Sequence, residues 1–179
     1  MPYGFLDLAS TPAVRAAQEA NGVGEHWANF HGDRLSDRFT EAEAAFIAER
    51  DSLYMATVSE SGWPYVQHRG GPPGFIRILD EKTLAIPDFR GNRQYITLGN
   101  LSENPKAFIF LMDYANQQRV KLWGTAKVVE DDAALLERLS HPDYPGKVER
   151  AIVFSVEAWD INCSRSPGSR SRTRRRRSA

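Results

Sequence analysis

The sequence contains very little cysteine. Its 179 residues include a single one, Cys163. A lone cysteine excludes a disulfide within the chain and cannot by itself build a metal site of the usual several-ligand kind. No nucleophile with a neighbouring base and no metal-binding cluster is visible either. Redox chemistry in this protein would therefore require a bound cofactor.

Long hydrophobic runs are also absent. No apolar stretch approaches the roughly 20 residues that a membrane-spanning helix needs. The segment from Met1 to Asp7 lacks the basic region and apolar stretch of a secretory signal. These absences predict a cytoplasmic protein with no membrane partner. The hydrophobic content of 41% is enough for one domain with a sizeable core, and the chain is too short for two ordinary ones.

The formal net charge of zero hides an uneven distribution. Residues 164–179 contain seven arginines and no acidic residue, which leaves 16 basic and 23 acidic residues, a charge of −7, in residues 1–163. The tail has too few apolar residues to form a core, so it is predicted to be disordered. It could attract polyanions such as nucleic acid or a membrane surface. The abrupt change after Cys163 and the acidic body favour an inert tail or an end altered by a shifted reading frame.

Residues 1–51 are predicted to form a helical arm. Thr11 and Pro12 are typical of a helix start, and good helix formers follow as far as Ala20. A second helix is predicted after Thr40, because Thr40 and Glu43 fit a capping box. Three aromatic residues of this arm are expected to anchor it on the barrel or on a second subunit: Trp27, Phe30 and Phe39.

Residues 52–163 change to the alternating pattern of strands, with a short helix expected over 130–139. Short strands joined mostly by hairpins favour a mainly β fold, an antiparallel barrel of six to seven strands with peripheral helices. The predicted strands are 53–58, 63–69, 75–79, 83–86, 106–113, 119–129 and 147–161.

The segment between the fourth and fifth strands has the composition of a phosphate cradle. Arg90 and Arg93 supply positive charge and forked donors, and Gly91 permits close approach to a ligand. Asn92 or Asp88 is a candidate cap for the helix expected next, whose first N–H groups could bind an anion. Arginine and asparagine in such loops are also common as solvated capping residues, and spacing alone does not choose between these interpretations.

Longer motifs resemble a known family. Residues 12–163 are similar to the pyridoxamine 5′-phosphate oxidase-like FMN-binding split barrels, specifically the pyridoxamine 5′-phosphate oxidase-related branch. The similarity rests on five segments: Glu49 to Phe75, Asp88 to Tyr95, Gly99 to Leu101, Asn104 to Pro105 and Leu122 to Ala126. This resemblance favours the phosphate interpretation of the cradle.

The resemblance implies a homodimer with FMN at the subunit interface. It implies that Arg69 and Arg93 bind the phosphate, and that Gln67 and Gln94 reach ribityl or ring atoms of the flavin. The complete set of positions that it matches to cofactor binding is Gln67, His68, Arg69, Arg90, Asn92, Arg93, Gln94, Tyr95, Arg119 and Lys121.

Several of these positions have an ordinary structural alternative. Arg119 and Lys121 could be solvated at a hairpin end, and His68 could be a scaffold residue instead of a proton donor to a reduced flavin. Three aromatic residues could stack on a flavin ring, but core positions are the preferred prediction for Trp63, Tyr65 and Trp123.

Two departures limit what the resemblance implies. The Arg-Leu-His substrate clamp of true pyridoxamine 5′-phosphate oxidases is absent, so the substrate does not carry over. Relatives continue Asn162-Cys163 with a segment like Pro-Gln-His-Ile, whereas this chain turns to serine and arginine. The resulting prediction is an FMN-dependent oxidoreductase acting on an unknown small molecule, with a reduced nicotinamide or oxygen as redox partner. A flavin- or haem-binding protein without turnover is the alternative.

Overall fold

A computed structural model describes residues 4–28 and 36–163. Phe30, predicted as an aromatic anchor, and the tail 164–179, predicted to be disordered, lie outside the described residues. The described part contains no helix long and apolar enough to cross a membrane.

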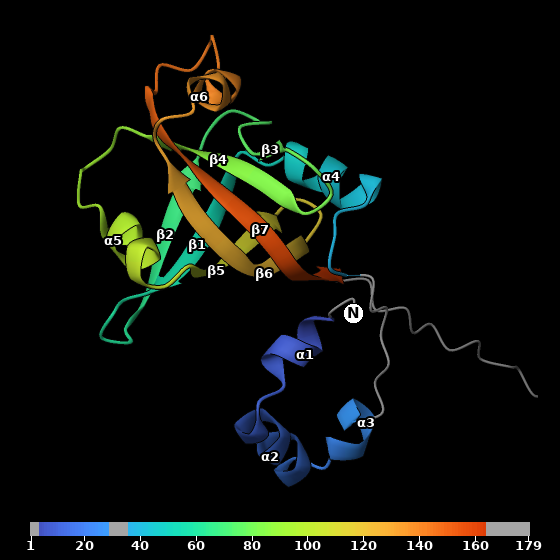
Figure 1. Cartoon of the computed structure of the whole chain (residues 1–179). Helices are drawn as coiled ribbons and strands as arrows, with labels where there is room; N and C mark the ends of the chain where they lie inside the picture. The colour runs from blue at the N-terminus through green and yellow to red at the C-terminus, as the bar shows by residue number, and fades with distance from the viewer. Residues whose placement is uncertain (1–3, 29–35, 164–179) are drawn as a thin grey trace, which may run out of the picture.

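Within residues 4–28 and 36–163, seven antiparallel strands form one curved sheet, a split barrel (Figure 1). The order of strands across the sheet is β2-β1-β5-β6-β7-β4-β3. The predicted mainly β barrel with peripheral helices is therefore confirmed. The strands are β1 (Ser52–Val58), β2 (Pro64–Gly70), β3 (Arg77–Ile78), β4 (Thr83–Phe89), β5 (Lys106–Asp113), β6 (Gln118–Val129) and β7 (Val148–Cys163).

The barrel interior is apolar because alternate residues of each strand point inward. In β1 the buried positions alternate strictly with half-buried ones. Phe154 of β7 is the largest fully buried side chain of this core among the described residues. Its other fully buried hydrophobic side chains include Leu53, Met55, Leu84, Ile86, Ile109, Leu111, Val120, Leu122 and Ile152.

The third strand is shorter than predicted. Only Arg77 and Ile78 pair with β4, although the sequence pattern predicts a strand over 75–79. The N–H of Phe75 instead donates to the carbonyl of Pro72 over 2.9 Å, which closes a turn. Phe75 and Ile76 are buried, so their apolar character reflects the core and not a strand.

Three helices lie around the barrel: α4 (Glu41–Ala48), α5 (Ile96–Glu103) and α6 (Ala133–Leu139). The capping box of α4 is confirmed, because the side chains of Thr40 and Glu43 each reach the other's backbone. Helix α5 is tied to β1 by a buried hydrogen bond from Asn100 Nδ2 to Thr57 Oγ1 of 2.9 Å. Helix α6 covers β4 and β7 with Leu135 and Leu139.

The first part of the N-terminal arm, residues 4–28, contains α1 (Phe5–Ala9), α2 (Pro12–Ala20) and α3 (Gly24–Ala28), and Figure 1 shows it below the barrel. The predicted start of α2 is confirmed, since Thr11 Oγ1 accepts from the N–H of Val14. None of the three helices has a buried residue. Helix α1 contacts the barrel through the ring of Phe5, which stacks on that of Trp123 at 5.6 Å between centroids.

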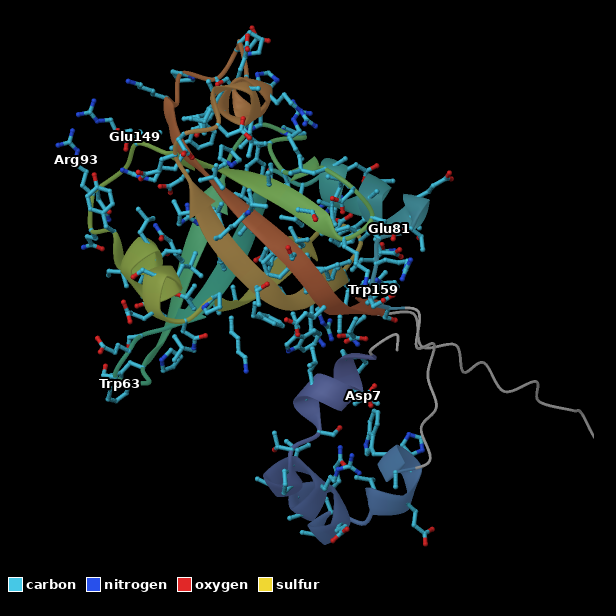
Figure 2. The ribbon with its side chains drawn as sticks, viewed as in Figure 1. Asp7, Trp63, Glu81, Arg93, Glu149 and Trp159 are labelled. Carbon is cyan, nitrogen blue, oxygen red and sulfur yellow. The ribbon has the colours of Figure 1, made fainter. Side chains whose placement is uncertain are left out.

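Residues 36–39 fasten the chain to the barrel just before α4. The backbone N–H of Trp159 donates to the carbonyl of Ser36 over 2.8 Å, and its indole N–H donates to that of Arg38 over 2.7 Å. The side chain of Phe39 is buried, as predicted for an anchor, and its backbone N–H donates to the carbonyl of Glu81. Figure 2 shows Trp159 and Glu81 on the same side of the barrel.

The barrel is open between β2 and the end of β4. Across residues 4–28 and 36–163, β2 pairs only with β1, and β4 pairs with β7 and β3. Pro87 lies near this end of β4, where a residue without an N–H is tolerated because no further strand needs the donor. A pocket with a mostly polar lining lies at this opening.

Candidate functional site

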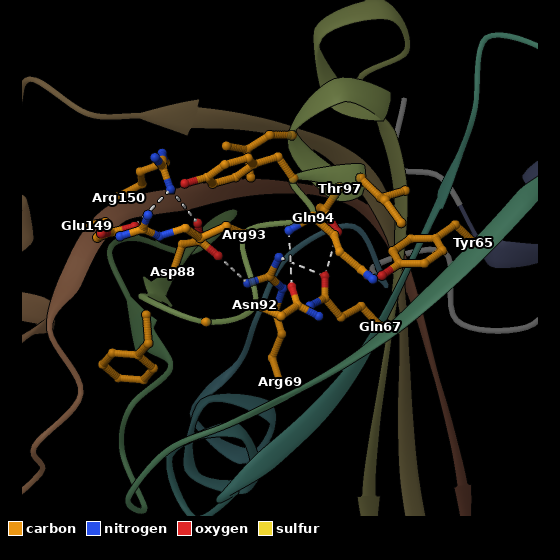
Figure 3. A pocket seen from close by; sticks show the side chains of 15 residues that line it. Tyr65, Gln67, Arg69, Asp88, Asn92, Arg93, Gln94, Thr97, Glu149 and Arg150 are labelled. Atoms are coloured by element: carbon orange, nitrogen blue, oxygen red, sulfur yellow. Dashed lines mark hydrogen bonds and ion pairs between the residues drawn. The ribbon is translucent and has the colours of Figure 1, made fainter.

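A pocket occupies the opening between β2, the end of β4, the loop 90–95, the start of α5 and the start of β7 (Figure 3). The cavity has a volume of about 200 Å³. Its lining is mostly polar and comprises Tyr65, Gln67, Arg69, Asp88, Phe89, Gly91, Asn92, Arg93, Gln94, Tyr95, Ile96, Thr97, Leu98, Glu149 and Arg150.

The loop before α5 has an uncommon backbone conformation. Arg93 and Tyr95 have φ angles of 61° and 54°, in the left-handed region that non-glycine residues rarely adopt. Asn92 Oδ1 accepts a hydrogen bond of 3.1 Å from the N–H of Gln94 and stabilises the turn. Strained residues of this kind gather at ligand sites, where the surrounding structure maintains them.

Helix α5 begins without a side-chain cap. Tyr95 occupies the N-cap position, and none of the described side chains accepts a hydrogen bond there. The prediction that Asn92 or Asp88 caps this helix is wrong, because Asn92 turns to Gln94 and Asp88 binds two arginines. Ile96, Thr97 and Leu98, in the first turn of α5, line the pocket, so the uncapped helix start and the positive end of the helix dipole border it.

Arg69 carries a buried donor that has no partner. Its side chain is only 9% exposed, and its Nη1 donates to Asp88 Oδ1 over 2.7 Å. Its Nη2 lies 3.5 Å from Gln67 Oε1. Its Nε is buried and has no hydrogen-bond partner among the described residues. A buried unsatisfied donor is costly, so this atom marks a place where a ligand acceptor would be favourable.

Gln67 is held in the pocket from the other side. The hydroxyl of Thr97, in the first turn of α5, donates to Gln67 Oε1 over 2.9 Å. Because this oxygen accepts from both Thr97 and Arg69, the side-chain amide group is left to donate toward a ligand. Figure 3 shows Gln67, Arg69 and Thr97 converging on the cavity.

Arg150 joins the far wall of the pocket to three carboxylates. Its Nη1 lies 3.2 Å from Asp88 Oδ2 and 3.4 Å from Glu149 Oε2, and its Nε donates to Glu130. Its guanidinium also lies over the ring of Tyr95, 5.1 Å from the centroid. The hydrogen bond to Glu130, followed by that to Asp88, raises the pKa of Arg150 well above its ordinary value, so it is always charged.

Six of the ten predicted site residues line this pocket. They are Gln67, Arg69, Asn92, Arg93, Gln94 and Tyr95. Arg90 lies at its edge, where its Nε is 3.6 Å from Glu149 Oε1, but it does not line the cavity. Arg93 is exposed and forms no ion pair within the described parts of the chain, so its charge is available to a ligand.

The remaining three predicted residues lie on another face of the sheet. His68 packs against the ring of Tyr54, and Lys121 Nζ donates to Asp160 over 2.9 Å. Arg119 is paired with Asn162 in the β6–β7 register. The structure does not bring His68, Arg119 or Lys121 into the pocket of the same chain.

The three aromatic residues predicted for the core do not lie in it. Trp63 is 75% exposed in the β1–β2 hairpin, at the tip that Figure 2 shows away from the barrel. Tyr65 is half-buried and lines the pocket. Trp123 is half-buried between the rings of Phe5 and Phe108. For Tyr65, alternation along β2 explains this result, since the inward face of that strand supplies the pocket and not the core.

Sequence reasoning missed several residues of the site. Tyr65 could have been found, because residues 65, 67 and 69 share one face of a strand. For Asp88, the sequence predicts only a candidate helix cap. Thr97 and Arg150 carry no local signal, since their place in the pocket depends on how α5 and β7 meet the opening of the barrel.

The described residues contain no group of three or more histidine, cysteine, aspartate or glutamate side chains that could hold a metal ion. What the pocket offers is an excess of N–H donors with two paired carboxylates. Such a donor set suits an anion, and a phosphate monoester in particular.

A family model described as pyridoxamine 5′-phosphate oxidase matches residues 39–162. Among curated proteins, no match was found. Solved structures with a similar fold include HupZ from Group A Streptococcus, with a TM-score of 0.57, 20% identity and coverage of 70% of this chain and 95% of that one.

Two further structures show the same fold. A putative pyridoxamine 5′-phosphate oxidase from Lactobacillus delbrueckii has a TM-score of 0.53 and 22% identity, covering 69% of this chain and 94% of its own. An FMN-binding protein from Syntrophomonas wolfei has a TM-score of 0.51 and 12% identity, covering 80% of this chain and 96% of its own.

Proposed function

This chain belongs to the pyridoxamine 5′-phosphate oxidase family, and on that premise we propose that its pocket binds FMN and that the protein is an FMN-dependent oxidoreductase. The proposed substrate is a small molecule, with a reduced nicotinamide or oxygen as the redox partner. The Syntrophomonas wolfei protein of similar fold, which is FMN-binding by name, supports the choice of cofactor.

One observation carries the phosphate assignment: the Nε of Arg69, which has no hydrogen-bond partner in the described parts of the chain, lies in the same pocket as the uncapped start of α5. A phosphate has enough acceptor oxygens for both, and the charge of Arg93, which forms no ion pair among the described residues, adds to the attraction. The residues present therefore fit the phosphate group of FMN. Asn92 and Tyr95 shape the loop that presents these donors.

The size of the pocket supports a homodimer. Ligand pockets usually enclose roughly 300–1,000 Å³, whereas this cavity has about 200 Å³. It can hold a phosphate and part of a ribityl chain, while the flavin ring would extend beyond it. A second copy of the chain would cover the ring, and the predicted residues His68, Arg119 and Lys121 lie on a face that could take part.

That face has the character of an interface. Cross-strand neighbours on the outer side of β2, β1, β5 and β6 place Val66, Ala56, Phe108 and Trp123 in one row. Val66 is 59% exposed. A contiguous row of apolar side chains on a sheet face is typical of a protein–protein contact. We assign this row, which we call the outer row, to the proposed homodimer interface.

When bound, FMN would supply the two-electron chemistry, and the protein would position it. Gln67 is fixed by Thr97 and Arg69, so its amide group can donate to ribityl or ring oxygens. Gln94 lines the same wall and has the same donor chemistry. Tyr65 lies on the same face of β2 as Gln67, and its ring can cover an apolar part of the ligand.

A flavin-binding protein without turnover is the second candidate. It is favoured by the state of the acids, since both carboxylates that line the pocket, Asp88 and Glu149, are ion-paired with arginine. Each serves as a counter-charge to arginine, and the described lining of the pocket contains no further carboxylate. The predicted cytoplasmic location fits both functions equally well.

An absorption spectrum of the purified full-length chain, recorded before and after addition of FMN, tests the proposal. Paired flavin bands that remain with the protein through gel filtration are expected. Bleaching of those bands by NADH or NADPH would support the oxidoreductase, whereas bound flavin that neither nucleotide reduces would favour the binding protein. A protein that retains no FMN would contradict both.

A further inference from the structure

The phosphate end of the pocket is bordered by a chain of alternating charges. Asp88 lies between Arg69 and Arg150, at 2.7 Å and 3.2 Å. Arg150 continues the chain to Glu130 and to Glu149, and Glu149 lies 3.6 Å from Arg90. Three arginines therefore oppose three carboxylates, and the formal charge of this cluster is zero.

Arg93 stands outside the cluster. It lines the pocket and forms no ion pair within the described residues, so it brings the total charge to +1. The attraction for a phosphate dianion therefore depends on the balance of the cluster as well as on the groups that touch the ligand. Changing one member of the cluster changes the charge that the phosphate meets by a full unit.

Arg150 is the member on which this balance depends. It is the only residue of the cluster bound to three carboxylates, and its side chain is 17% exposed, so solvent screens it incompletely. Without it, Asp88, Glu130 and Glu149 would oppose only Arg69 and Arg90, and the total with Arg93 would fall to zero.

We propose that Arg150 is a positioning residue of the phosphate site: together with Arg69 and Arg90 it offsets the carboxylates of Asp88, Glu130 and Glu149, so that the charge of Arg93 and the Nε of Arg69 can attract a phosphate. Glu130 is the opposing member: it holds Arg150 but does not line the pocket, and its side chain is 64% exposed. This inference rests on the proposed phosphate-binding function and adds the residues that set its strength.

The proposal predicts opposite effects for two variants that break the same ion pair. Arg150→Met lowers the total charge by one and should weaken FMN binding about tenfold, whereas Glu130→Gln raises it by one and should strengthen binding about threefold. Arg150→Lys keeps the charge and should remain within about threefold of the wild type. A purely structural ion pair would make Arg150→Met and Glu130→Gln both weaken binding.

The experiment titrates the full-length chain and its variants with FMN and with riboflavin, followed by flavin fluorescence, and with inorganic phosphate, followed by calorimetry. Arg138→Met and Glu137→Gln, on the exposed side of α6, are controls for net charge. Riboflavin lacks the phosphate, so its affinity should change less than about twofold. Raising the salt concentration should reduce both FMN effects.

The inference is supported if Arg150→Met weakens and Glu130→Gln strengthens the binding of both FMN and phosphate, while the affinity for riboflavin stays unchanged. Weaker binding by Glu130→Gln, or equal shifts for riboflavin, would overturn it. If Arg150→Met does not fold, Glu130→Gln and Arg150→Lys still decide the sign. If the wild type binds phosphate but not FMN, the proposed function fails and the phosphate series alone tests the charge balance. A wild type that binds neither overturns both.

Discussion

The guanidinium of Arg69 on β2 donates to the carboxylate of Asp88 on β4 over 2.7 Å, across the place where these two strands share no backbone hydrogen bond. Both side chains are largely buried, with 9% and 13% exposure. The pocket therefore lies where side-chain ion pairs replace a strand ladder. The predictions below test this opening, the site within it and the barrel around it.

Replacement of Arg93 by alanine should weaken FMN binding by about 1.5–3 kcal/mol, the value of a charge-assisted hydrogen bond. The side chain is exposed and forms no ion pair in the described regions, so the free energy of unfolding should change little. Titration calorimetry with FMN measures the first effect and denaturant unfolding the second. Unchanged affinity would remove Arg93 from the site.

Replacement of Asp88 by asparagine should lower the free energy of unfolding by about 2–4 kcal/mol. The change removes the negative charge shared by Arg69 and Arg150, replaces one of the two accepting oxygens with an NH2 group, and so leaves a buried guanidinium without its counter-charge. Asp143→Asn, at an exposed loop position, is the matched control. A loss no larger than the control's would show that the two ion pairs add nothing to stability.

Gly124 should not tolerate a larger side chain. A Cβ atom there would lie 2.1 Å from the carbonyl oxygen of Ser155 and 2.7 Å from the ring of Phe154, at the irregular step between β6 and β7. Gly124→Ala should cost about 3 kcal/mol or more, because backbone and a buried ring must both shift. Gly99→Ala is the control, because a Cβ atom at Gly99 would meet no other described atom within 4 Å. Since Gly99 lies within α5, this substitution should leave the stability unchanged or increase it. Equal thermal stability of the two variants would contradict this packing.

Protonation of Asp37 should make the protein less stable in acid. Hydrogen bonding to Arg38, and then to Lys82, lowers the pKa of this carboxylate from 3.8 to about 2 despite its burial. Because the folded state binds the proton more weakly than the unfolded state, the contribution is complete above about pH 4 and is lost as the pH falls towards 2. Its size is about 2 kcal/mol.

The comparison of Asp37→Asn with the wild type, by denaturant unfolding across that pH range, checks this value. The variant should be less stable near neutral pH, and the difference should shrink as the pH approaches 2. A difference that does not depend on pH would mean that Asp37 acts through its shape alone.

Replacement of Val66 by glutamate should prevent dimerisation if the outer row is the interface. The side chain is 59% exposed, so a charge there does not disturb the core of a single chain. Light scattering after gel filtration should show a dimer for the wild type and a monomer for Val66→Glu, with weaker retention of FMN. Val14→Glu, on the exposed arm helix α2, should leave the dimer intact. A monomeric wild type would reject the proposed interface.

Much of the fold could be predicted because its signals are local. The β1–β2 hairpin follows from alternation around the turn at residues 59–62, and the start of α4 follows from the paired side chains of Thr40 and Glu43. The strand predicted at Phe75 and Ile76 is wrong, because a buried turn and a strand can show the same short apolar run.

The candidate site was only partly predictable for a related reason. Gln67, Arg69 and the loop 90–95 could be chosen because they form compact polar motifs. Arg150 lies in a strand of ordinary alternation, and only the register of β7 against β4 places it opposite Asp88. Tertiary proximity of this kind leaves no mark in the local sequence.

Because the barrel is open at Arg69 and Asp88, ligand binding there is coupled to the stability of the barrel. A phosphate held by Arg69 on β2 and by the start of α5 would link two sides of an opening that no backbone hydrogen bonds close. Amide hydrogens of β2 and of the end of β4 should then exchange with solvent more slowly in the ligated protein, while those of β6 and β7 stay unchanged. The melting temperature would accordingly report the occupancy of the pocket.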